Sequence, residues 1–226
     1  MLKRKIDRHL EEWKENKNHK PLIIKGCRQC GKTSSVLAFA KKYYQYVVYL
    51  NFFENPHFQS IFQDSLDIDY LTMMMSALLG DKAIFKPGET IIIFDEIQEC
   101  PQARTSLKFF KVDGRYDVIG TGSLLGIKGY REMPSSIPVG YETVIEMYPM
   151  DFEEFLWANG ITDNMIDMLR ISLKNETPVV DALHHRFQQL LLQYTVVGGM
   201  PDAVQTFVST KQMDAVLQIQ RDIVAS

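Results

Sequence analysis

A short stretch near the start of the chain has the residue types and the spacing needed to hold phosphate groups. It begins at Gly26 and ends in Gly31, Lys32 and Thr33, which is the G-x-x-x-x-G-K-T spacing of a Walker A loop. The glycines let the backbone curl around an anion, and the N–H groups of the loop and of the following helix point toward it. We expect Lys32 to reach the β- and γ-phosphates of a nucleoside triphosphate and Thr33 to offer its hydroxyl group to Mg²⁺. The predicted nucleotide-binding residues are Gly26, Cys27, Arg28, Gln29, Cys30, Gly31, Lys32, Thr33 and Ser34.

Two acidic residues, Asp95 and Glu96, follow the strongest strand signal of the chain, the four consecutive apolar residues 91–94, three of which are β-branched isoleucines. Ligands bind at the carboxyl ends of strands in open α/β sheets, so an apolar strand ending in this pair is typical of a Walker B segment. We expect Asp95 to hold Mg²⁺ through its water shell and Glu96 to polarise the water that attacks the γ-phosphate. Glu96 and Lys32 are therefore predicted catalytic residues. The simpler interpretation, an acidic pair that only ends a surface strand, is disfavoured because the pair follows a phosphate-binding loop.

A third strand end with small and hydroxyl residues lies at residues 116–123. If this strand lies beside the one that leads into the loop, Thr121 or Ser123 can reach the γ-phosphate or the attacking water as a sensor. A polar turn without ligand contact explains the same residues equally well, so both interpretations stay open at this point.

The composition is that of an ordinary folded protein without a strongly charged surface. Of its 226 residues, 46% are hydrophobic and 23% are charged, which argues against disorder and against a fibrous fold. The net charge of −3 gives no general attraction for nucleic acid or for an anionic membrane. The first residues lack the apolar segment of a signal peptide, and three cysteines are too few for a disulfide framework. We therefore expect a cytoplasmic protein without a membrane partner.

Short apolar runs alternate with segments of helical periodicity over the first 150 residues. This alternation predicts an α/β fold, and runs without polar interruption predict strands buried on both faces of a mainly parallel sheet. The expected strands are residues 21–25, 46–51, 90–95, 116–121 and 142–147. The expected helices between them include residues 33–44, 68–79 and 102–111. We predict a P-loop domain over residues 1–150, with a five-stranded sheet flanked by helices.

The strand pattern stops after Pro149, and helical patterns follow. Asp151 is a suitable N-cap, and Glu153 and Glu154 complement the positive end of the helix that it begins, so we assign them to stability before catalysis. The predicted helices are residues 152–159, 163–173, 178–196, 202–208 and 211–223. We predict that residues 151–226 form a helical lid and the start of a C-terminal domain. Because the apolar pattern runs to the last residue, we expect the chain to be a piece of a longer protein.

Five segments of the chain together carry a resemblance to a known family. They are residues 21–33, 94–98, 120–123, 148–155 and 198–201. They resemble the prokaryotic AAA-like P-loop ATPases that carry a C-terminal domain of unknown function. The first two segments are shared by many ATPases, whereas the last two, YPMDFEEF and GGMP, are more specific to this family.

The resemblance implies an ATPase core with an added strand between the two Walker strands, followed by a helical lid. It favours Ser123 over Thr121 as the sensor-like residue, and we therefore predict that Ser123 acts in catalysis. AAA-type rings are expected to use an arginine from a neighbouring subunit. None of the three arginines considered for that role lies in a matching motif; they are Arg131, Arg170 and Arg186.

Cys27 and Cys30 form a C-x-x-C pair, which in other proteins is a redox centre or half of a zinc site. Here the phosphate-binding loop fixes their backbone, and family members have small or apolar residues at these positions. We interpret both cysteines as small fillers of the loop, with an oxidation switch on nucleotide binding as the alternative.

The function predicted from these features is that of an ATPase with Mg²⁺ as cofactor, which cleaves the β–γ phosphoanhydride bond and drives a conformational change. The alternative is a nucleotide-dependent switch that hydrolyses slowly and sets the affinity for a protein or DNA partner. A small-molecule kinase is disfavoured by Asp95 and Glu96. We expect a protein partner or a homo-oligomer, and any contact with nucleic acid would come from a region beyond Ser226.

Overall fold

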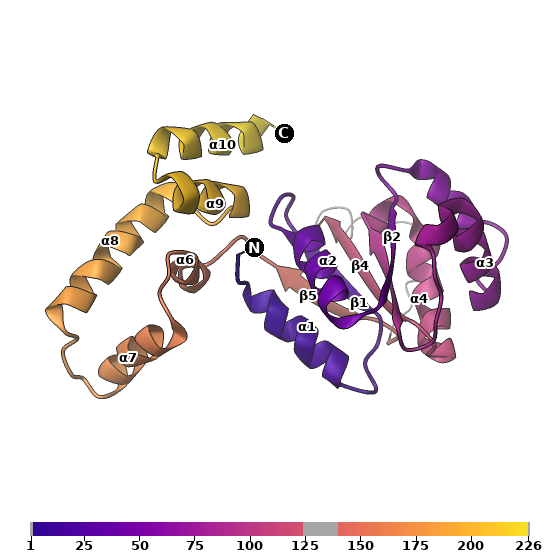
Figure 1. Ribbon diagram of the computed structural model, residues 1–226, viewed down its shortest axis with the longest axis horizontal. Helices are drawn as coiled ribbons and strands as arrows, with labels where there is room; N and C mark the ends of the chain where they lie inside the picture. Colours follow the sequence, from indigo (N-terminus) through magenta and orange to yellow (C-terminus); the bar gives the residue numbers. More distant parts are fainter. Residues whose placement is uncertain (1, 124–139, 226) are drawn as a thin grey trace. The chain divides into compact units, whose positions relative to one another are not determined.

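The apolar runs of the sequence form a parallel sheet in the computed structural model, which describes residues 2–123 and 140–225 (Figure 1). Its strands are β1 (Leu22–Gly26), β2 (Tyr46–Asn51), β3 (Thr90–Asp95), β4 (Asp117–Ser123) and β5 (Thr143–Met147). They lie in the order β2-β3-β4-β1-β5, and all neighbouring pairs are parallel. The predicted α/β fold is therefore confirmed, and β4 is the added strand between the two Walker strands.

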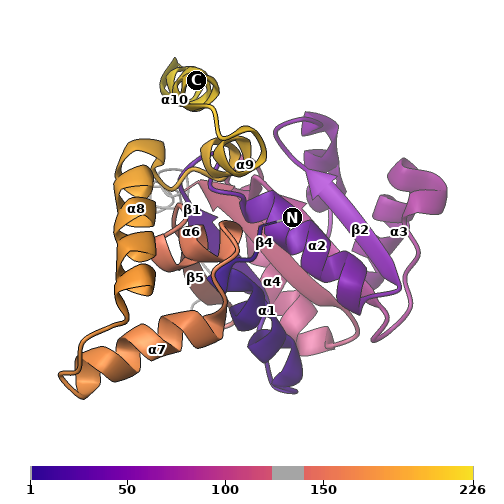
Figure 2. The same cartoon turned by 60° about the vertical axis from the view of Figure 1, so that its left-hand side comes forward.

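Helices cover both faces of this sheet because its strands are apolar on both faces. All six residues of β3 are buried. One face packs against α3 (Ile68–Leu79) and α4 (Pro101–Asp113), whose Leu71 and Leu107 share a core with Ile92. The other face is covered by α1 (Lys5–Glu15) and α2 (Lys32–Tyr43), as Figures 1 and 2 show. Side chains that alternate between the two faces of a strand are thus removed from water on either side.

Short 3-10 helices complete the described part of this α/β layer structure. They are η1 (Pro56–Phe62), η2 (Gly80–Lys82) and η3 (Ile97–Glu99). The first carries Phe62 into the core, where its ring meets Phe94 edge-on at a centroid distance of 5.5 Å. Segments this short have no periodic pattern, so the sequence does not predict them.

The chain divides into two compact units. Residues Arg8–Met147 contain the sheet, and Met1–Asp7 together with Tyr148–Ser226 form the second unit. The helices of the second unit are α6 (Phe152–Ala158), α7 (Asp163–Lys174), α8 (Asp181–Val197), α9 (Pro201–Thr210) and α10 (Met213–Ala225). The expected helical region is confirmed, while the domain boundary at residue 150 stays a prediction. Within residues 2–123 and 140–225, no helix is long and apolar enough to cross a membrane.

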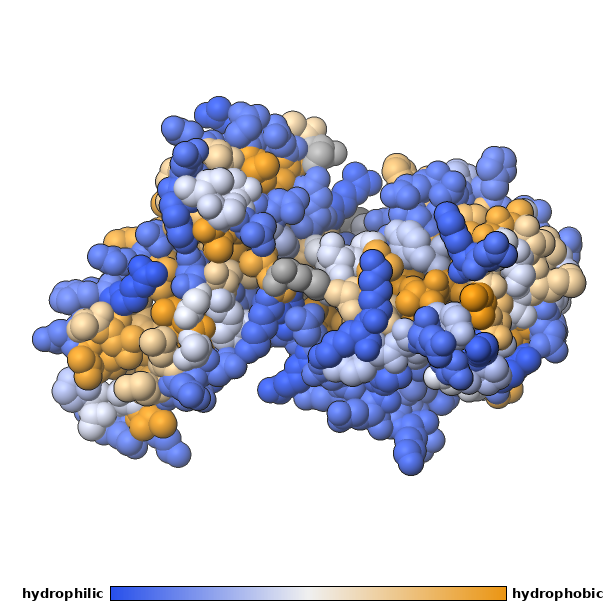
Figure 3. Space-filling view, viewed as in Figure 1, coloured by the Kyte–Doolittle hydropathy of each residue, from blue (hydrophilic) through white to orange (hydrophobic). Residues whose placement is uncertain are grey.

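The second unit has its own apolar core. Phe155 is fully buried and stacks on Phe207, with ring centroids 5.9 Å apart. Other apolar side chains of this unit remain on its surface and gather over α7, which carries Met168, Ile171 and Leu173 (Figure 3). The unit is therefore held by a core around Phe155 and keeps an exposed apolar face on α7.

A buried acid, Glu154, fixes the start of the second unit. Asp151 and Glu154 form a reciprocal capping box at the beginning of α6. Glu154 is 4% exposed, and its Oε1 accepts hydrogen bonds from Arg4 Nε at 3.1 Å and from the backbone N–H of Lys5 at 2.7 Å. A buried charge needs such partners. Asp151 and Glu154 of the YPMDFEEF segment therefore stabilise the start of α6 and hold the N-terminal residues against it.

The glycines of the GGMP segment allow a close backbone contact in the same unit. Gly198 ends α8 with a φ of 72°, and Pro201 begins α9. The backbone N–H of Met150 donates to Gly199 O at 2.6 Å, and a Cβ atom on Gly199 would lie 2.1 Å from Met150 O. Only glycine therefore fits at position 199, because the backbone of Met150 lies against it.

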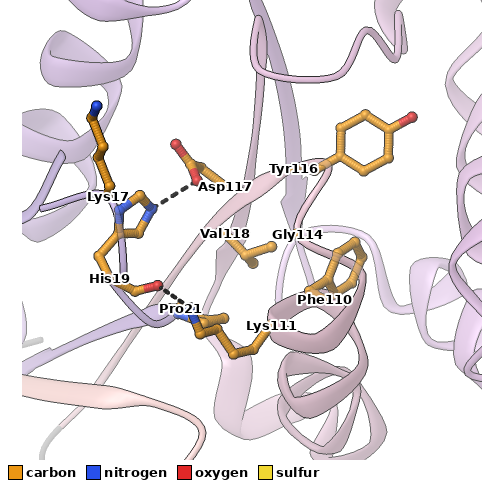
Figure 4. Close-up of a pocket in the computed structure, with 9 residues that line it drawn as sticks. All are labelled: Lys17, His19, Pro21, Phe110, Lys111, Gly114, Tyr116, Asp117 and Val118. Carbon is orange, nitrogen blue, oxygen red and sulfur yellow. Dashed lines mark hydrogen bonds and ion pairs between the residues drawn. The ribbon is translucent and has the colours of Figure 1, made fainter. Parts of the chain in front are cut away.

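In the first unit, His19 fixes the segment between α1 and β1 to the sheet (Figure 4). Its Nδ1 lies 2.7 Å from Asn16 O, and its Nε2 lies 2.8 Å from Asp117 Oδ1. Both partners only accept hydrogen bonds when Asp117 is ionised, so the doubly protonated imidazolium satisfies both contacts together. Tyr44 donates to the other oxygen of Asp117. His19 and Asp117 also border a cavity of about 100 Å³.

Hydrogen bonding to Asp117 raises the pKa of His19, against the opposing effects of burial and of Lys111. Burial opposes the change in Asp117, but the hydrogen bonds from His19 and Tyr44 lower the pKa of its carboxyl group. The pair therefore stabilises the fold below the unfolded histidine pKa of about 6.5. That contribution is lost as the pH rises through the raised pKa of His19, or falls through the lowered pKa of Asp117.

We expect His19→Gln to destabilise the protein by on the order of 1 kcal/mol near pH 6, and by less as the pH rises above the folded-state pKa of His19. Urea unfolding of both proteins over a pH series measures this difference. His9→Gln removes an exposed histidine of α1 and is the matched control. A destabilisation that stays constant with pH would contradict the charged form of His19.

Candidate functional site

The loop between β1 and α2 has the curled backbone expected of a phosphate-binding loop. Gln29 and Gly31 have φ angles of 61° and 94°, in the left-handed region. These turns bring the chain to Gly31, which is the N-cap of α2. Successive N–H groups in such a curl, followed by a helix N-terminus, form a concave anion site. The local geometry therefore suits a phosphate group.

Gly26 is required at the end of β1 because β5 runs close beside it. A Cβ atom on Gly26 would lie 2.2 Å from Met147 O, a separation that real Cβ atoms do not show. Met147 O also accepts a weak hydrogen bond from the buried Cys30 Sγ at 3.7 Å. Cys27, in contrast, is exposed. The two cysteines thus have different surroundings, one packed against β5 and the other open to solvent.

Lys32 directs its side chain into the loop that precedes it. The residue is 6% exposed, and its Nζ donates to Gly26 O at 3.2 Å and to Cys27 O at 2.7 Å. An ammonium group has three donors, so it can bind an additional acceptor. The positive charge predicted to contact phosphates therefore lies within the curl of the loop.

The carboxylate of Asp95 is the centre of the site, because it is 3% exposed and accepts hydrogen bonds from five residues. The donors are Thr33 Oγ1 (3.0 and 3.1 Å to the two oxygens), Tyr49 OH (2.7 Å), Asn51 Nδ2 (3.4 Å), Thr121 Oγ1 and the backbone N–H of Glu96 (3.2 Å). The structure thereby brings together Thr33 and Asp95, the two residues predicted to hold Mg²⁺.

Tyr49 and Asn51 are part of this site, although neither belongs to a motif that the sequence shows. Both lie on β2, where Asn51 pairs with Asp95 in the strand register. Burial and the hydrogen bond to Asp95 raise the pKa of Tyr49 above its ordinary value, so its hydroxyl stays protonated. One feature of the sequence could have identified them: both lie near the carboxyl end of an expected strand, and ligands bind at that edge of α/β sheets.

Glu96 follows Asp95 in a left-handed conformation, with a φ of 52°. Its side chain is half-buried and accepts a hydrogen bond of 2.5 Å from Gln98 Nε2. The left-handed turn ends β3 and begins η3, so Glu96 leaves the direction of the strand. Its predicted action on water stays a prediction.

The two sensor candidates lie in different surroundings at the end of β4. Thr121 is fully buried and donates its hydroxyl hydrogen bond to Asp95. Ser123 is half-buried and pairs with Gly26 in the register of β4 and β1. The strand arrangement on which the sensor hypothesis depended is present, because β4 lies directly beside β1. Contact of Ser123 with a nucleotide stays a prediction.

The remaining predicted residues differ mainly in exposure. Among the loop residues, those exposed to solvent are Cys27, Arg28, Gln29 and Ser34. Across the described ranges, no group of three or more histidine, cysteine or acidic side chains is arranged to hold a metal ion, so the C-x-x-C pair has no further zinc ligands there. Of the arginines considered, Arg131 lies outside the described residues and Arg170 pairs with Glu153 and Asp167.

A family model described as an AAA domain matches residues 18–156. The chain belongs to this family. The match spans the loop and strands β1 to β5 of the AAA domain, and the resemblance to AAA-like P-loop ATPases is confirmed. No curated protein sequence matches the chain.

The AAA domain also has structural counterparts of low sequence identity. The ORC2 protein of Aeropyrum pernix, in ADPNP-ADP complexes, is 16% identical, with 69% of this chain and 49% of ORC2 covered and a TM-score of 0.45. Its ADP form is 13% identical, with coverages of 94% and 65% and a TM-score of 0.48. PCH-2 of C. elegans is 11% identical, with coverages of 97% and 65% and a TM-score of 0.48. The chain therefore spans between 49% and 65% of these solved chains.

We expect Gly26→Ala to disrupt the loop, since the added methyl group would overlap Met147 O. The variant should lose about 1 to 3 kcal/mol of stability and at least tenfold in ATP affinity. Thermal unfolding and calorimetric ATP binding measure the two effects. Cys27→Ala changes the next, exposed position and should leave stability unchanged. Unaltered stability and affinity in Gly26→Ala would show that β5 does not constrain the loop.

Proposed function

We propose that the chain is a Mg²⁺-dependent ATPase that couples its nucleotide state to a conformational change. The observation that carries the proposal is the contact of Thr33 with Asp95, which are 62 positions apart in the sequence and are joined by hydrogen bonds of 3.0 and 3.1 Å. It joins the hydroxyl group that follows the phosphate-binding loop to the carboxylate at the end of β3, across the intervening strand β4. Membership of the AAA domain family supports the same activity.

The residues at this contact fit Mg²⁺. Mg²⁺ prefers oxygen ligands and keeps several of its waters, which suits one hydroxyl group and one carboxylate better than a closed protein cage. Thr33 would bind the ion directly, and Asp95 would hold it through water. When bound, the ion supplies positive charge that neutralises the β- and γ-phosphate oxygens.

Lys32 and Glu96 would act on the phosphates and on the attacking water. The Lys32 ammonium donates to two neutral carbonyl oxygens, and phosphate oxygens form stronger, charge-assisted hydrogen bonds with it. Glu96 would orient a water molecule and accept its proton during attack on the γ-phosphate. Ser123 lies opposite Gly26 in the strand register, which supports its proposed role as a sensor at the same edge of the sheet.

The close contact between the loop and β5 supports conformational coupling. Gly26 and Cys30 both adjoin the carbonyl group of Met147, which is the last residue of the first unit. A change in the loop on nucleotide binding would therefore act on the point where the chain leaves this unit. We propose that a protein partner or a second copy of the chain responds to that change, in the cytoplasm.

The test of hydrolysis is phosphate release from Mg-ATP by the parent and by Glu96→Gln. We expect the variant to bind ATP as the parent does but to release phosphate at least 10²-fold more slowly, because the water lacks its base. Glu99→Gln makes the same change at an exposed position of η3 and should be as active as the parent. Full turnover in Glu96→Gln would exclude the assigned role.

A nucleotide-dependent switch with slow hydrolysis is the second candidate, and the bond between Gln98 and Glu96 favours it. The amide group of Gln98 occupies an oxygen of the carboxylate that would otherwise contact water. If this bond slows turnover, Gln98→Ala should release phosphate several-fold faster than the parent at equal ATP affinity. An equal or lower rate in Gln98→Ala would leave hydrolysis without this restraint and would count against the switch.

A further inference from the structure

Two hydroxyl groups contact the Asp95 carboxylate from the strands on either side of it. Tyr49 on β2 donates to Oδ2 at 2.7 Å, and Thr121 on β4 donates to Oδ1. The sheet order places β3 between β2 and β4, so the two donors approach from opposite neighbours. Each oxygen of the carboxylate thus has its own hydroxyl donor outside the phosphate-binding loop.

We propose that Tyr49 and Thr121 are positioning residues that hold the Asp95 carboxylate in the orientation needed to bind hydrated Mg²⁺. The inference rests on the proposed Mg²⁺-dependent function and assigns two residues to it that the Walker motifs do not include. Neither hydroxyl is assigned to the metal or to the nucleotide. Both act through Asp95.

The direction of the Tyr49 hydrogen bond is fixed by Asn51. Asn51 Nδ2 lies 3.2 Å from the Tyr49 oxygen, and an amide nitrogen only donates. The Tyr49 oxygen therefore accepts from Asn51, and its own proton is available for Asp95. Asn51 is fixed in turn, because its Oδ1 accepts from the backbone N–H groups of Phe53 and Glu54 at 3.0 and 2.9 Å.

Metal binding makes these two donors more important. Thr33 donates to both oxygens of Asp95, but its hydroxyl is the group expected to bind Mg²⁺ directly. A hydroxyl group has a single proton, so Thr33 shares one hydrogen bond between the two oxygens, and binding to the ion would restrict its position further. Tyr49 and Thr121 do not belong to the loop, so they can keep both oxygens in place throughout.

The burial of the group explains why a single hydroxyl has a measurable effect. Asp95 is 3% exposed and Thr121 is fully buried, so water does not readily replace a lost donor. Hydrogen bonds to a charged group are stronger than those between neutral groups. Residues that orient a metal ligand from outside typically change metal affinity by about 10- to 100-fold.

The test measures metal-dependent nucleotide binding by Tyr49→Phe, without relying on turnover. ATP binding is titrated by calorimetry in EDTA and at a series of Mg²⁺ concentrations, and Mn²⁺ binding to the ATP complex is followed by electron paramagnetic resonance. We expect binding in EDTA to equal that of the parent. The Mg²⁺ and Mn²⁺ concentrations for half-saturation should rise about tenfold.

Matched variants separate positioning from a general effect on the sheet. Tyr46→Phe removes a hydroxyl from the same strand, where it contacts Gln45 and Lys86, and should bind metal as the parent does. Thr121→Val removes the second donor at nearly constant volume, whereas Thr121→Ser keeps it. We expect weakened metal binding in Thr121→Val and recovery in Thr121→Ser.

Two outcomes would overturn the proposal, and they are distinguishable. If the parent binds ATP equally well with and without Mg²⁺, the metal-dependent function fails and the positioning role fails with it. If the parent shows the metal effect and Tyr49→Phe retains it in full, only the positioning role is wrong. In that second outcome, a lower thermal stability of Tyr49→Phe would show that the hydroxyl group only stabilises the sheet.

Discussion

The buried carboxylate of Asp95 is the group on which the arrangement of the site depends. A carboxylate with 3% exposure loses its hydration and must regain hydrogen bonds from the protein. Its donors come from α2, β2, β4 and the turn after β3, so satisfying one charge fixes four segments relative to one another. Removal of any segment would leave this largely buried carboxylate without one of its donors.

Close backbone approach gives this sheet edge its shape. A Cβ atom on Gly120 would lie 2.6 Å from Ile23 and 3.0 Å from Ile97, so glycine lets β4 pass between a β1 side chain and η3. Gly26 does the same between β1 and β5, against Met147 O. These contacts set β4 directly beside β1 and bring Thr121 to Asp95. The close approach at Gly120 thus helps to place the hydroxyl group of Thr121 beside the carboxylate.

The sequence predicted the parts of the site that have fixed local spacing. Lys32 and Asp95 each follow from a motif within a few positions of the chain, and five apolar runs predicted the strands of the parallel sheet. Tyr49 was not predictable in the same way, because a tyrosine in an apolar strand has the same local pattern whether it packs in the core or donates to a carboxylate. Its role depends on the register of β2 with β3, which brings Asn51 opposite Asp95 and is set only when the strands pair. The hydrogen bond from Thr121 depends likewise on the strand order.

The family-specific segment begins where the loop's contact with β5 ends. Met147 O adjoins Gly26 and Cys30, and a few residues further along the chain the backbone N–H of Met150 donates to Gly199 O. The chain therefore passes from a residue fixed by the phosphate-binding loop to one fixed in the core of the second unit, with no long linker between them. If the loop moves on nucleotide binding, as proposed above, a flexible linker would absorb a small displacement of Met147, whereas a short segment with fixed partners at both ends would transmit it. The close contacts of Gly26 and Gly199 thus fix the two ends of the short segment that leads from the sheet to the start of α6.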